Sequence, residues 1–346
     1  MKTIVKIEIA ILILVLLVGA AMVLVSEGVL NLFFDPVIKE HTAEPVIAEE
    51  PAAETAEPDP TAAEETIRET EPQTTTVEGT DGQTEEGPRV ITATRYFAYD
   101  VRDGEYLQKV GDGDEKLYPA SITKLLSAYV VLSHMDPQET VVVGDALTLV
   151  QEGSSVADLQ EGDTLTVEQL IAAMMLPSGN DAAQVAAVAA GRAIVGKDAD
   201  CQTAMATFVA EMNEQAEAFG MKNSHFENPD GWHNENHYTT MNDLVTLSEK
   251  VLANQIILKY TSRVAETVKL PDRDLEWKNT NYLLYSEGEA YLPNTIGLKT
   301  GYTDAAGGCL ITAFFEGDRL LLIGVFGCPA YTMDRYLDTV DIYNSL

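Results

Sequence analysis

Residues 35–88 are the segment that most limits how this chain can fold, because they lack the side chains that build a core. The segment is rich in Glu, Pro, Thr and Ala and has almost no aromatic or large aliphatic residues. Such a composition cannot bury enough apolar surface to offset the entropy lost on ordering. We therefore predict a disordered acidic stalk over residues 35–88 and a folded domain confined to residues 89–346.

Negative charge is present in both the stalk and the predicted domain. The formal net charge of the chain is −33. Residues 40–86 carry 15 acidic side chains and one arginine, a local charge of −14, and residues 1–39 balance to zero, which leaves −19 for residues 87–346. Repulsion of this size argues against nucleic acid or another polyanion as a partner.

Residues 9–25 form an uncharged, mostly apolar run that follows Lys2 and Lys6. With the apolar residues on either side, this run is close to the length that spans a bilayer. A cleavable signal peptide usually has a shorter apolar region that ends in a small-residue cleavage site, whereas residues 19–21 (GAA) are followed by further Val and Leu. We favour a transmembrane anchor within residues 1–34, with the lysines inside the cell and the domain outside. A signal sequence that is cleaved to release the protein is the alternative.

Strand patterns lie at both ends of the predicted domain, and helical patterns lie between them. Strands are predicted at residues 91–99, 105–110, 140–143, 163–166, 296–300, 309–315 and 320–326, and helices from residue 119 onward and at 167–176, 181–190, 205–219, 242–253 and 332–343. This order predicts an α+β fold, in which an antiparallel sheet is built from both ends of the domain and carries a helical insert.

A serine and a lysine one helical turn apart form the first candidate site. Pro119 favours a helix start, so Ser121 would lie in the first turn, near unpaired N–H groups, with Lys124 on the same face. A serine hydroxyl needs a base, and a lysine can serve as that base only if burial or a second cation lowers its pKa. The pair therefore requires further cationic and hydrogen-bonding groups downstream.

Three short motifs supply such groups in a fixed order along the chain. They are Ser121-x-x-Lys124, Ser178-Gly179-Asn180 and Lys299-Thr300-Gly301. Each is weak alone, since a Ser-x-x-Lys is expected about once by chance in a chain of this length, but the ordered set is not expected by chance.

With these motifs the chain resembles the penicillin-binding DD-peptidases, and within them the low-molecular-weight D-alanyl-D-alanine carboxypeptidases. The resemblance covers roughly residues 90–346 and includes PASITK at 119–124, HFENPDG at 225–231, HYTT at 237–240 and GLKTGYT at 297–303. It implies a β-lactamase-like fold with helices on the faces of the sheet, and an enzyme that removes the terminal D-alanine from peptidoglycan stem peptides during cell-wall synthesis. It also implies covalent inhibition by β-lactam antibiotics.

The resemblance assigns roles to residues of all three motifs. Ser121 would be the acylated nucleophile and Lys124 its base, while Ser178 and Asn180 would relay a proton and bind the substrate amide. The third motif would bind substrate: Lys299 would lower the pKa of Lys124 and help to hold the terminal carboxylate, Thr300 would contact that carboxylate beside Gly301, and the N–H groups of Tyr302 and Ser121 would form the oxyanion hole. Arg335 would add positive charge, although a solvated surface arginine is an equally good interpretation.

Two alternatives remain open at the level of sequence. The first is a serine β-lactamase on the same scaffold, which the absence of a Glu-x-x-Leu-Asn run between the second and third motifs disfavours. The second is a catalytically idle protein that binds or senses the cell wall, which the intact Ser121, Lys124 and Lys299 disfavour. Many family members also carry a C-terminal β domain and membrane helix, whereas here we expect attachment through the N-terminal anchor.

Neither the histidines nor the cysteines form a metal pattern. His225, His233 and His237 lie in a loop rich in Pro, Gly and Asn without a matching carboxylate pattern, which favours packing and loop hydrogen bonds over zinc. Cys201, Cys309 and Cys328 are too few for a disulfide framework, so we expect three free thiols. A pairing of Cys309 with Cys328 stays open, because these two residues flank a predicted hairpin. We therefore predict neither a metal nor a cofactor.

Overall fold

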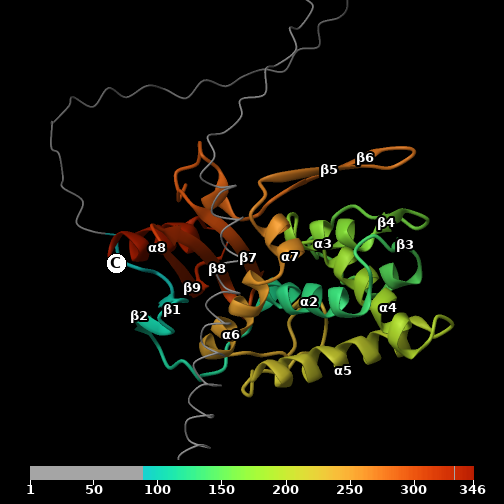
Figure 1. The fold of residues 1–346 in the computed structure, drawn as a ribbon, viewed down its shortest axis with the longest axis horizontal. Helices are drawn as coiled ribbons and strands as arrows, with labels where there is room; N and C mark the ends of the chain where they lie inside the picture. The colour runs from blue at the N-terminus through green and yellow to red at the C-terminus, as the bar shows by residue number, and fades with distance from the viewer. Residues whose placement is uncertain (1–88, 331) are drawn as a thin grey trace, which may run out of the picture. The chain divides into compact units, whose positions relative to one another are not determined.

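The computed structural model describes residues 89–330 and 332–346 (Figure 1). The predicted anchor and stalk lie outside these residues. The strands are β1 (Arg95–Asp100), β2 (Glu105–Val110), β3 (Thr140–Val142), β4 (Thr164–Thr166), β5 (Ala265–Lys269), β6 (Asp274–Lys278), β7 (Thr295–Thr303), β8 (Gly307–Glu316) and β9 (Arg319–Cys328). The helices are α2 (Lys124–His134), α3 (Val167–Met175), α4 (Asn180–Val195), α5 (Cys201–Phe219), α6 (Met241–Leu252), α7 (Gln255–Thr261) and α8 (Asp334–Asn344), with 3₁₀ turns η1 (Ala120–Thr123), η2 (Asp145–Leu149) and η3 (Tyr282–Leu284).

The main sheet joins the two ends of the domain, as predicted. Its strand order is β2-β1-β9-β8-β7, and every neighbouring pair is antiparallel. Phe97 of β1 lies opposite Gly324 of β9, where any larger side chain would meet the phenylalanine ring. The β1–β2 hairpin and the last three strands therefore form one layer, although about 190 residues of the chain lie between them.

Alternation along the strands gives the sheet two buried faces. On one face Ala98, Phe314 and Ile323 pack with residues of α8. On the other face the ring of Phe97 contacts that of Phe326, and the hydroxyl of neighbouring Tyr99 donates a hydrogen bond to Glu249 of α6. The sheet is thus covered by α8 on one side and by the helical part of the domain on the other (Figure 1).

Helix α4 is the centre of the helical insert and packs against α2, α3 and α5. Its buried alanines allow close packing, and at Gly191 a side chain would meet the backbone of Ala204 in α5. Two of these neighbouring helices begin at side-chain caps: α3 has a capping box between Thr166 and Gln169, and α5 is capped by Asp200. Helix α5 ends at Gly220, which adopts φ +89 as a C-terminal stop should.

Two elements were not anticipated from the sequence, namely α7 and the β5–β6 hairpin. In the hairpin every second side chain faces solvent, and Val268, Leu275 and Trp277 supply its buried side. The indole N–H of Trp277 donates a hydrogen bond to the carbonyl of Ala157, and Arg273 pairs with Asp163 at 2.6 Å. The hairpin therefore holds the segment that leads into β4.

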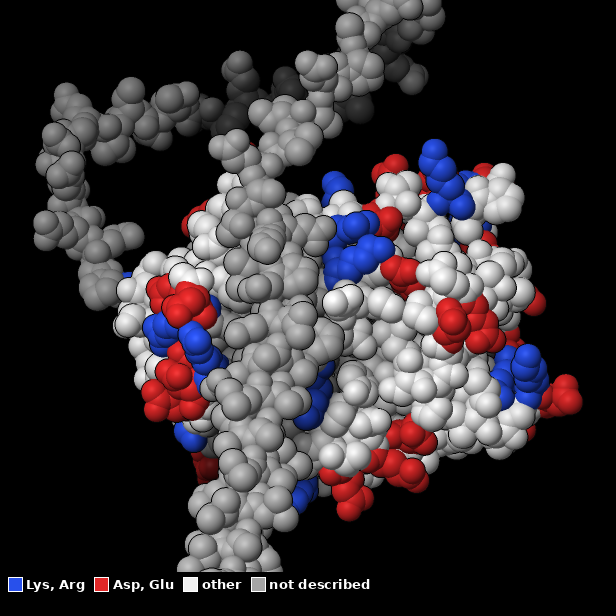
Figure 2. Space-filling model, in the orientation of Figure 1, with Lys and Arg blue, Asp and Glu red and all other residues white. Residues whose placement is uncertain are grey.

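Both signs of charge are scattered over the part of the described domain that is visible in Figure 2. The three cysteines are free thiols, as expected, with Cys309 and Cys328 buried. Within residues 89–330 and 332–346, no helix combines the length and apolar character that crossing a bilayer requires.

Candidate active site

Ser121 lies in a 3₁₀ turn that leads directly into α2. Pro119 precedes this turn, η1 spans Ala120–Thr123, and Lys124 is the first residue of α2. Ala120 has φ +48, which is uncommon for a residue with a Cβ atom and is often found beside functional residues. The predicted helix start is confirmed, with a tighter first turn than an α-helix provides.

The ammonium group of Lys124 contacts parts of three separate chain segments. Its Nζ lies 2.8 Å from Ser121 Oγ, 2.7 Å from Asn180 Oδ1 and 2.9 Å from the carbonyl oxygen of Asp230. The lysine is completely buried. Three acceptors match the three N–H bonds of an ammonium group, so the charged form is fully hydrogen-bonded.

Burial lowers the pKa of Lys124 to about 8, whereas the charges of Asp230 and Asp181 act in the opposite direction. A substantial fraction of the side chain is therefore neutral slightly above neutral pH. A neutral amine keeps two N–H bonds, which suffice for Asn180 and the Asp230 carbonyl, and its lone pair then faces the hydroxyl of Ser121. This arrangement allows a lysine to accept the serine proton.

Lys299 of β7 is also buried and donates to the carbonyl of Thr300 at 3.1 Å. Its pKa lies well below the ordinary value because of burial first, then repulsion from Lys124 and Arg335. The sequence argument expected Lys299 to lower the pKa of Lys124. Burial lowers the pKa of Lys124, and because repulsion between two cations acts on both of them, the role expected of Lys299 stays a prediction.

Two glycines pack on the backbone of the turn that carries Ser121. A Cβ atom on Gly301 would lie 3.0 Å from the Ala120 Cβ and 3.1 Å from the Ser121 nitrogen. A Cβ atom on Gly231 would overlap the carbonyl oxygen of Ala120. Strand β7 and the 225–231 segment therefore hold the nucleophile between them, and this contact requires glycine on both sides.

The second motif organises the opposite side of the site. Ser178 is buried with φ +62, and the N–H of Asn180 donates to the carbonyl of Ser155 at 2.7 Å. The carboxylate of Asp181 accepts hydrogen bonds from the N–H groups of Ala157, Leu159 and Ala182. Burial raises the pKa of Asp181 despite these bonds. Asn180 and Asp181 thus hold the segment 155–159 in place.

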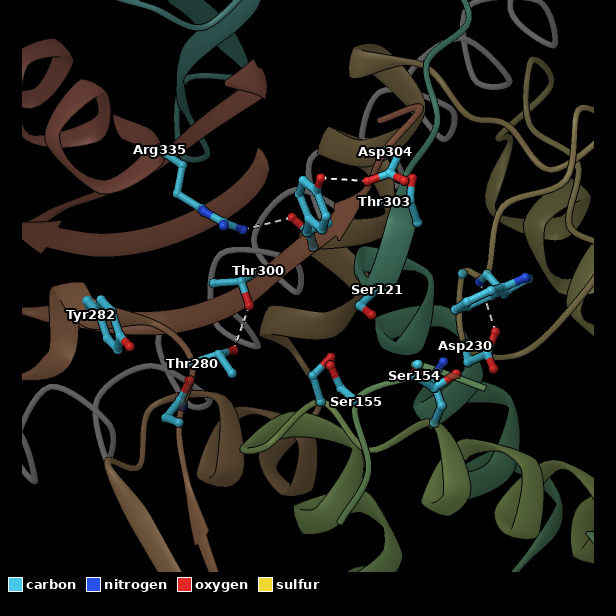
Figure 3. Close-up of a pocket in the computed structure, with 18 of the residues that line it drawn as sticks. Ser121, Ser154, Ser155, Asp230, Thr280, Tyr282, Thr300, Thr303, Asp304 and Arg335 are labelled. Atoms are coloured by element: carbon cyan, nitrogen blue, oxygen red, sulfur yellow. Dashed lines mark hydrogen bonds between the residues drawn. The ribbon is translucent and has the colours of Figure 1, made fainter. Parts of the chain in front are cut away.

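These segments enclose a cavity of about 1120 Å³ that contains Ser121. Figure 3 shows Ser121 between Thr300 on one side and Ser154 on the other. Thr300 Oγ1 lies 2.6 Å from Thr280 Oγ1, and Arg335 Nη1 donates to the carbonyl of Gly301 at 2.9 Å. Among the described residues the buried Nε of Arg335 has no hydrogen-bond partner. The cavity lining contains the predicted residues Ser121, Ser178, Asn180, Thr300, Gly301, Tyr302 and Arg335, while the buried Lys124 and Lys299 lie behind them.

Sequence reasoning missed several residues of the cavity. The carbonyl of Asp230 accepts a bond from Lys124, and its carboxylate accepts from Gln184 and from the N–H of Trp232. The HFENPDG phrase contained this aspartate but gave it no role. The other missed lining residues include Ser154, Ser155, Thr280, Tyr282 and Tyr285, which lie in loops and 3₁₀ turns without a periodic signal.

His237 supports the base of η1 through hydrogen bonds. Its Nδ1 accepts from the N–H of Glu227 at 3.1 Å, so the proton lies on Nε2, which is 2.8 Å from Thr123 Oγ1. Burial lowers the pKa of His237 to about 3. No group of three or more potential metal ligands occurs within residues 89–330 and 332–346.

A family model described as D-alanyl-D-alanine carboxypeptidase (peptidase S11) matches residues 81–329. The chain belongs to the D-alanyl-D-alanine carboxypeptidase family. Among curated family members, DacD of Escherichia coli is 31% identical over 257 residues, which cover 70% of this chain and 60% of DacD. DacF of Bacillus subtilis is 28% identical over 221 residues, or 62% of this chain and 52% of DacF. This chain therefore spans about half the length of DacF.

Solved structures confirm the predicted fold. The DD-transpeptidase of Streptomyces K15 superposes with a TM-score of 0.66 at 29% identity, covering 75% of this chain and 98% of that chain. Penicillin binding protein 6B from Escherichia coli gives a TM-score of 0.62 at 28% identity and covers 76% of this chain and 79% of that chain. The five-stranded sheet and its helices thus form an α+β domain of this family.

Proposed function

We propose that this protein is a serine D-Ala-D-Ala carboxypeptidase that removes the terminal D-alanine from peptidoglycan stem peptides. The observation that carries the proposal is the contact of 2.8 Å between Lys124 Nζ and Ser121 Oγ, in a site where burial lowers the pKa of the lysine to about 8. The family membership supports the same reaction class.

In the proposed acylation step, Ser121 Oγ attacks the carbonyl carbon of the penultimate D-alanine. Its proton passes to the neutral amine of Lys124 as the new ester bond forms. The N–H groups of Ser121 and Tyr302 stabilise the oxyanion, a contribution of about 3 kcal/mol per donor in acyl transfer. The peptide C–N bond then breaks, and the nitrogen of the leaving D-alanine takes up the proton, by way of Ser178.

In the proposed deacylation step, water attacks the ester carbon and Lys124 again accepts a proton. The C–O bond to Ser121 breaks, the serine recovers its proton, and the shortened stem peptide leaves as a carboxylate. Asn180 holds the Lys124 amine in place through both steps and also binds the substrate amide. No cofactor is needed, because every proton is carried by these side chains.

The terminal carboxylate of the substrate is proposed to bind where the third motif meets α8. Thr300 and Arg335 both line the cavity there, and the unpartnered buried Nε of Arg335 supports an anionic ligand at this position. Lys299 adds a further amine behind the strand. A carboxylate bound here would raise the pKa of Lys299 by favouring its charged form.

We propose an extracytoplasmic location, with attachment to the membrane through residues 1–34 or secretion after cleavage. The proposal rests on the apolar run at residues 9–25 and on a substrate that lies outside the membrane. Fractionation of cells that express the full chain tests it, because a cleaved signal would leave the protein in the medium at a smaller mass.

The activity is tested by measuring release of D-alanine from a pentapeptide stem by the purified full chain. The wild type is expected to release one D-alanine per peptide, and Ser121→Ala to release none. Ser133→Ala is a matched control, because Ser133 lies at the exposed end of the same helix and only bonds the carbonyl of Tyr129. Release by Ser121→Ala at the wild-type rate would overturn the proposed function.

A further inference from the structure

Arg89 bridges three carboxylates on one side of α8. Its Nη2 lies 2.6 Å from Asp334, and its Nη1 lies 2.6 Å from Asp338 and 3.0 Å from Asp341. The three aspartates follow one another at helical spacing, so they share a face and repel one another. A single guanidinium group compensates all three.

Asp338 is completely buried, so its carboxylate is the one that loss of this arginine would destabilise most. Its carboxylate also accepts hydrogen bonds from the N–H groups of Thr92 and Ala93 and from the hydroxyl of Thr92. These donors are neutral, so they do not cancel the charge. The segment that begins at Arg89 and α8 are thus joined by a buried ionic cluster.

The opposite side of α8 is part of the cavity. Arg335, next to Asp334 in sequence, donates to the carbonyl of Gly301, and the hydroxyl of Tyr336 donates to the carbonyl of Thr280 at 2.7 Å. Both side chains line the cavity that contains Ser121. The first turn of α8 therefore carries Asp334, a member of the Arg89 cluster, beside the two cavity residues Arg335 and Tyr336.

We infer that Arg89 is a positioning residue for substrate binding, which fixes the first turn of α8 so that Arg335 faces the carboxylate of the substrate. The inference rests on the proposed function. Loss of Arg89 leaves the three carboxylates without their shared cation, and Asp341 lies in the last turn of the helix, where the helix dipole opposes a negative charge. The turn that carries Arg335 relaxes, while Ser121, Lys124 and Asn180 keep their own contacts.

The test compares Arg89→Ala with Arg319→Ala in the full chain. Arg319 is a matched control because it also pairs with a completely buried carboxylate of the same domain, that of Asp100 at 2.9 Å, but is not part of the cavity lining or of α8. For each variant the KM and kcat of D-alanine release, the second-order rate constant of acylation by benzylpenicillin, and the thermal midpoint are measured.

We expect Arg89→Ala to raise KM and lower the acylation rate constant about five- to tenfold, with kcat within about twofold of wild type. We expect Arg319→Ala to lower the thermal midpoint by a comparable amount and to leave KM unchanged. Arg89→Lys retains the charge but cannot reach three carboxylates, so we expect it to recover part of the loss in KM and in acylation rate. This variant also keeps the inference testable if Arg89→Ala does not fold.

A double variant separates positioning from a general effect. If Arg89 acts through Arg335, adding Arg89→Ala to Arg335→Ala leaves KM no higher than Arg335→Ala alone. Additive losses, or an unchanged KM in Arg89→Ala with a reduced thermal midpoint, would overturn the inference. If the wild type releases no D-alanine, the proposed function is overturned. The role of Arg89 is then decided by comparing the rate constants of acylation by benzylpenicillin in the wild type and in Arg89→Ala. If the wild type neither releases D-alanine nor forms an adduct with benzylpenicillin, both the proposed function and the role of Arg89 are overturned.

Discussion

The side-chain oxygen of Asn180 accepts a hydrogen bond of 2.7 Å from the amine of Lys124, although 56 residues separate them in sequence. This bond connects the first motif to the second inside the protein, where the amine has no access to water. The protonation state of Lys124 therefore depends on the groups around it, and it can be shifted by changing one of them.

The rate of acylation should follow the neutral form of Lys124. Since burial lowers its pKa to about 8, the second-order rate constant with benzylpenicillin is expected to rise about tenfold per pH unit below pH 8 and to level off above it. Stopped-flow or quenched-flow measurements of acylation between pH 5.5 and 9.5 record this rise of the rate constant with pH. A rate that stays constant over the range would mean that no base with this pKa takes part.

The substitution Asn180→Asp should move the rise of the acylation rate to higher pH. A carboxylate in contact with the Lys124 amine stabilises its charged form and raises its pKa, so acylation near pH 7 is expected to fall by about 10- to 100-fold. The same pH series on the variant checks the shift. If the acylation rate of the variant is lower at every pH but still levels off near pH 8, Asn180 contributes to substrate binding alone.

Gly301→Ala should disturb the nucleophile through its backbone. The added methyl group would crowd Ala120 and the Ser121 nitrogen, at a cost of about 1–3 kcal/mol in unfolding free energy together with slower acylation. Gly144→Ala is the control for the loss of backbone freedom, since nothing lies within 4 Å of a Cβ atom there and any cost comes from its backbone angles (φ −152, ψ −131). Equal behaviour of the two variants in urea unfolding and in acylation would contradict this account of the β7 contact.

His237 should make the domain sensitive to acid. Burial lowers its pKa to about 3 in the folded state, so between pH 6.5 and 3 the unfolded chain binds the extra proton. From this group stability is expected to fall by up to about 1.4 kcal/mol per pH unit as the pH drops through that window. The substitution His237→Gln should flatten the pH dependence of urea unfolding. An equally steep dependence without His237 would assign the effect to other groups.

Much of the fold could be predicted from local pattern. The strands predicted at 91–99, 105–110, 309–315 and 320–326 and the helix predicted at 205–219 each overlap an element of the structure. The β5–β6 hairpin was missed because its two strands are short and carry few apolar residues, and because they depend on distant partners, such as the Ala157 carbonyl for Trp277. Tertiary contacts of that kind leave no periodic signal.

The candidate site was predictable only where short motifs mark it. Ser121, Lys124 and Asn180 meet as the motifs predict. The sequence required burial or a second cation to lower the pKa of Lys124, and the structure shows this side chain completely buried, with its pKa lowered by that burial. Asp230 contributes a backbone carbonyl, and a backbone atom carries no sequence signature of its role.

The most direct test of the account is the intact mass of the full chain after incubation with benzylpenicillin, beside Ser121→Ala and Ser133→Ala. The account predicts a stable adduct of one drug molecule on the wild type and on Ser133→Ala, and none on Ser121→Ala. An unmodified wild type with the drug intact would contradict an acylating serine at position 121. An unmodified wild type with the drug hydrolysed would identify a β-lactamase instead.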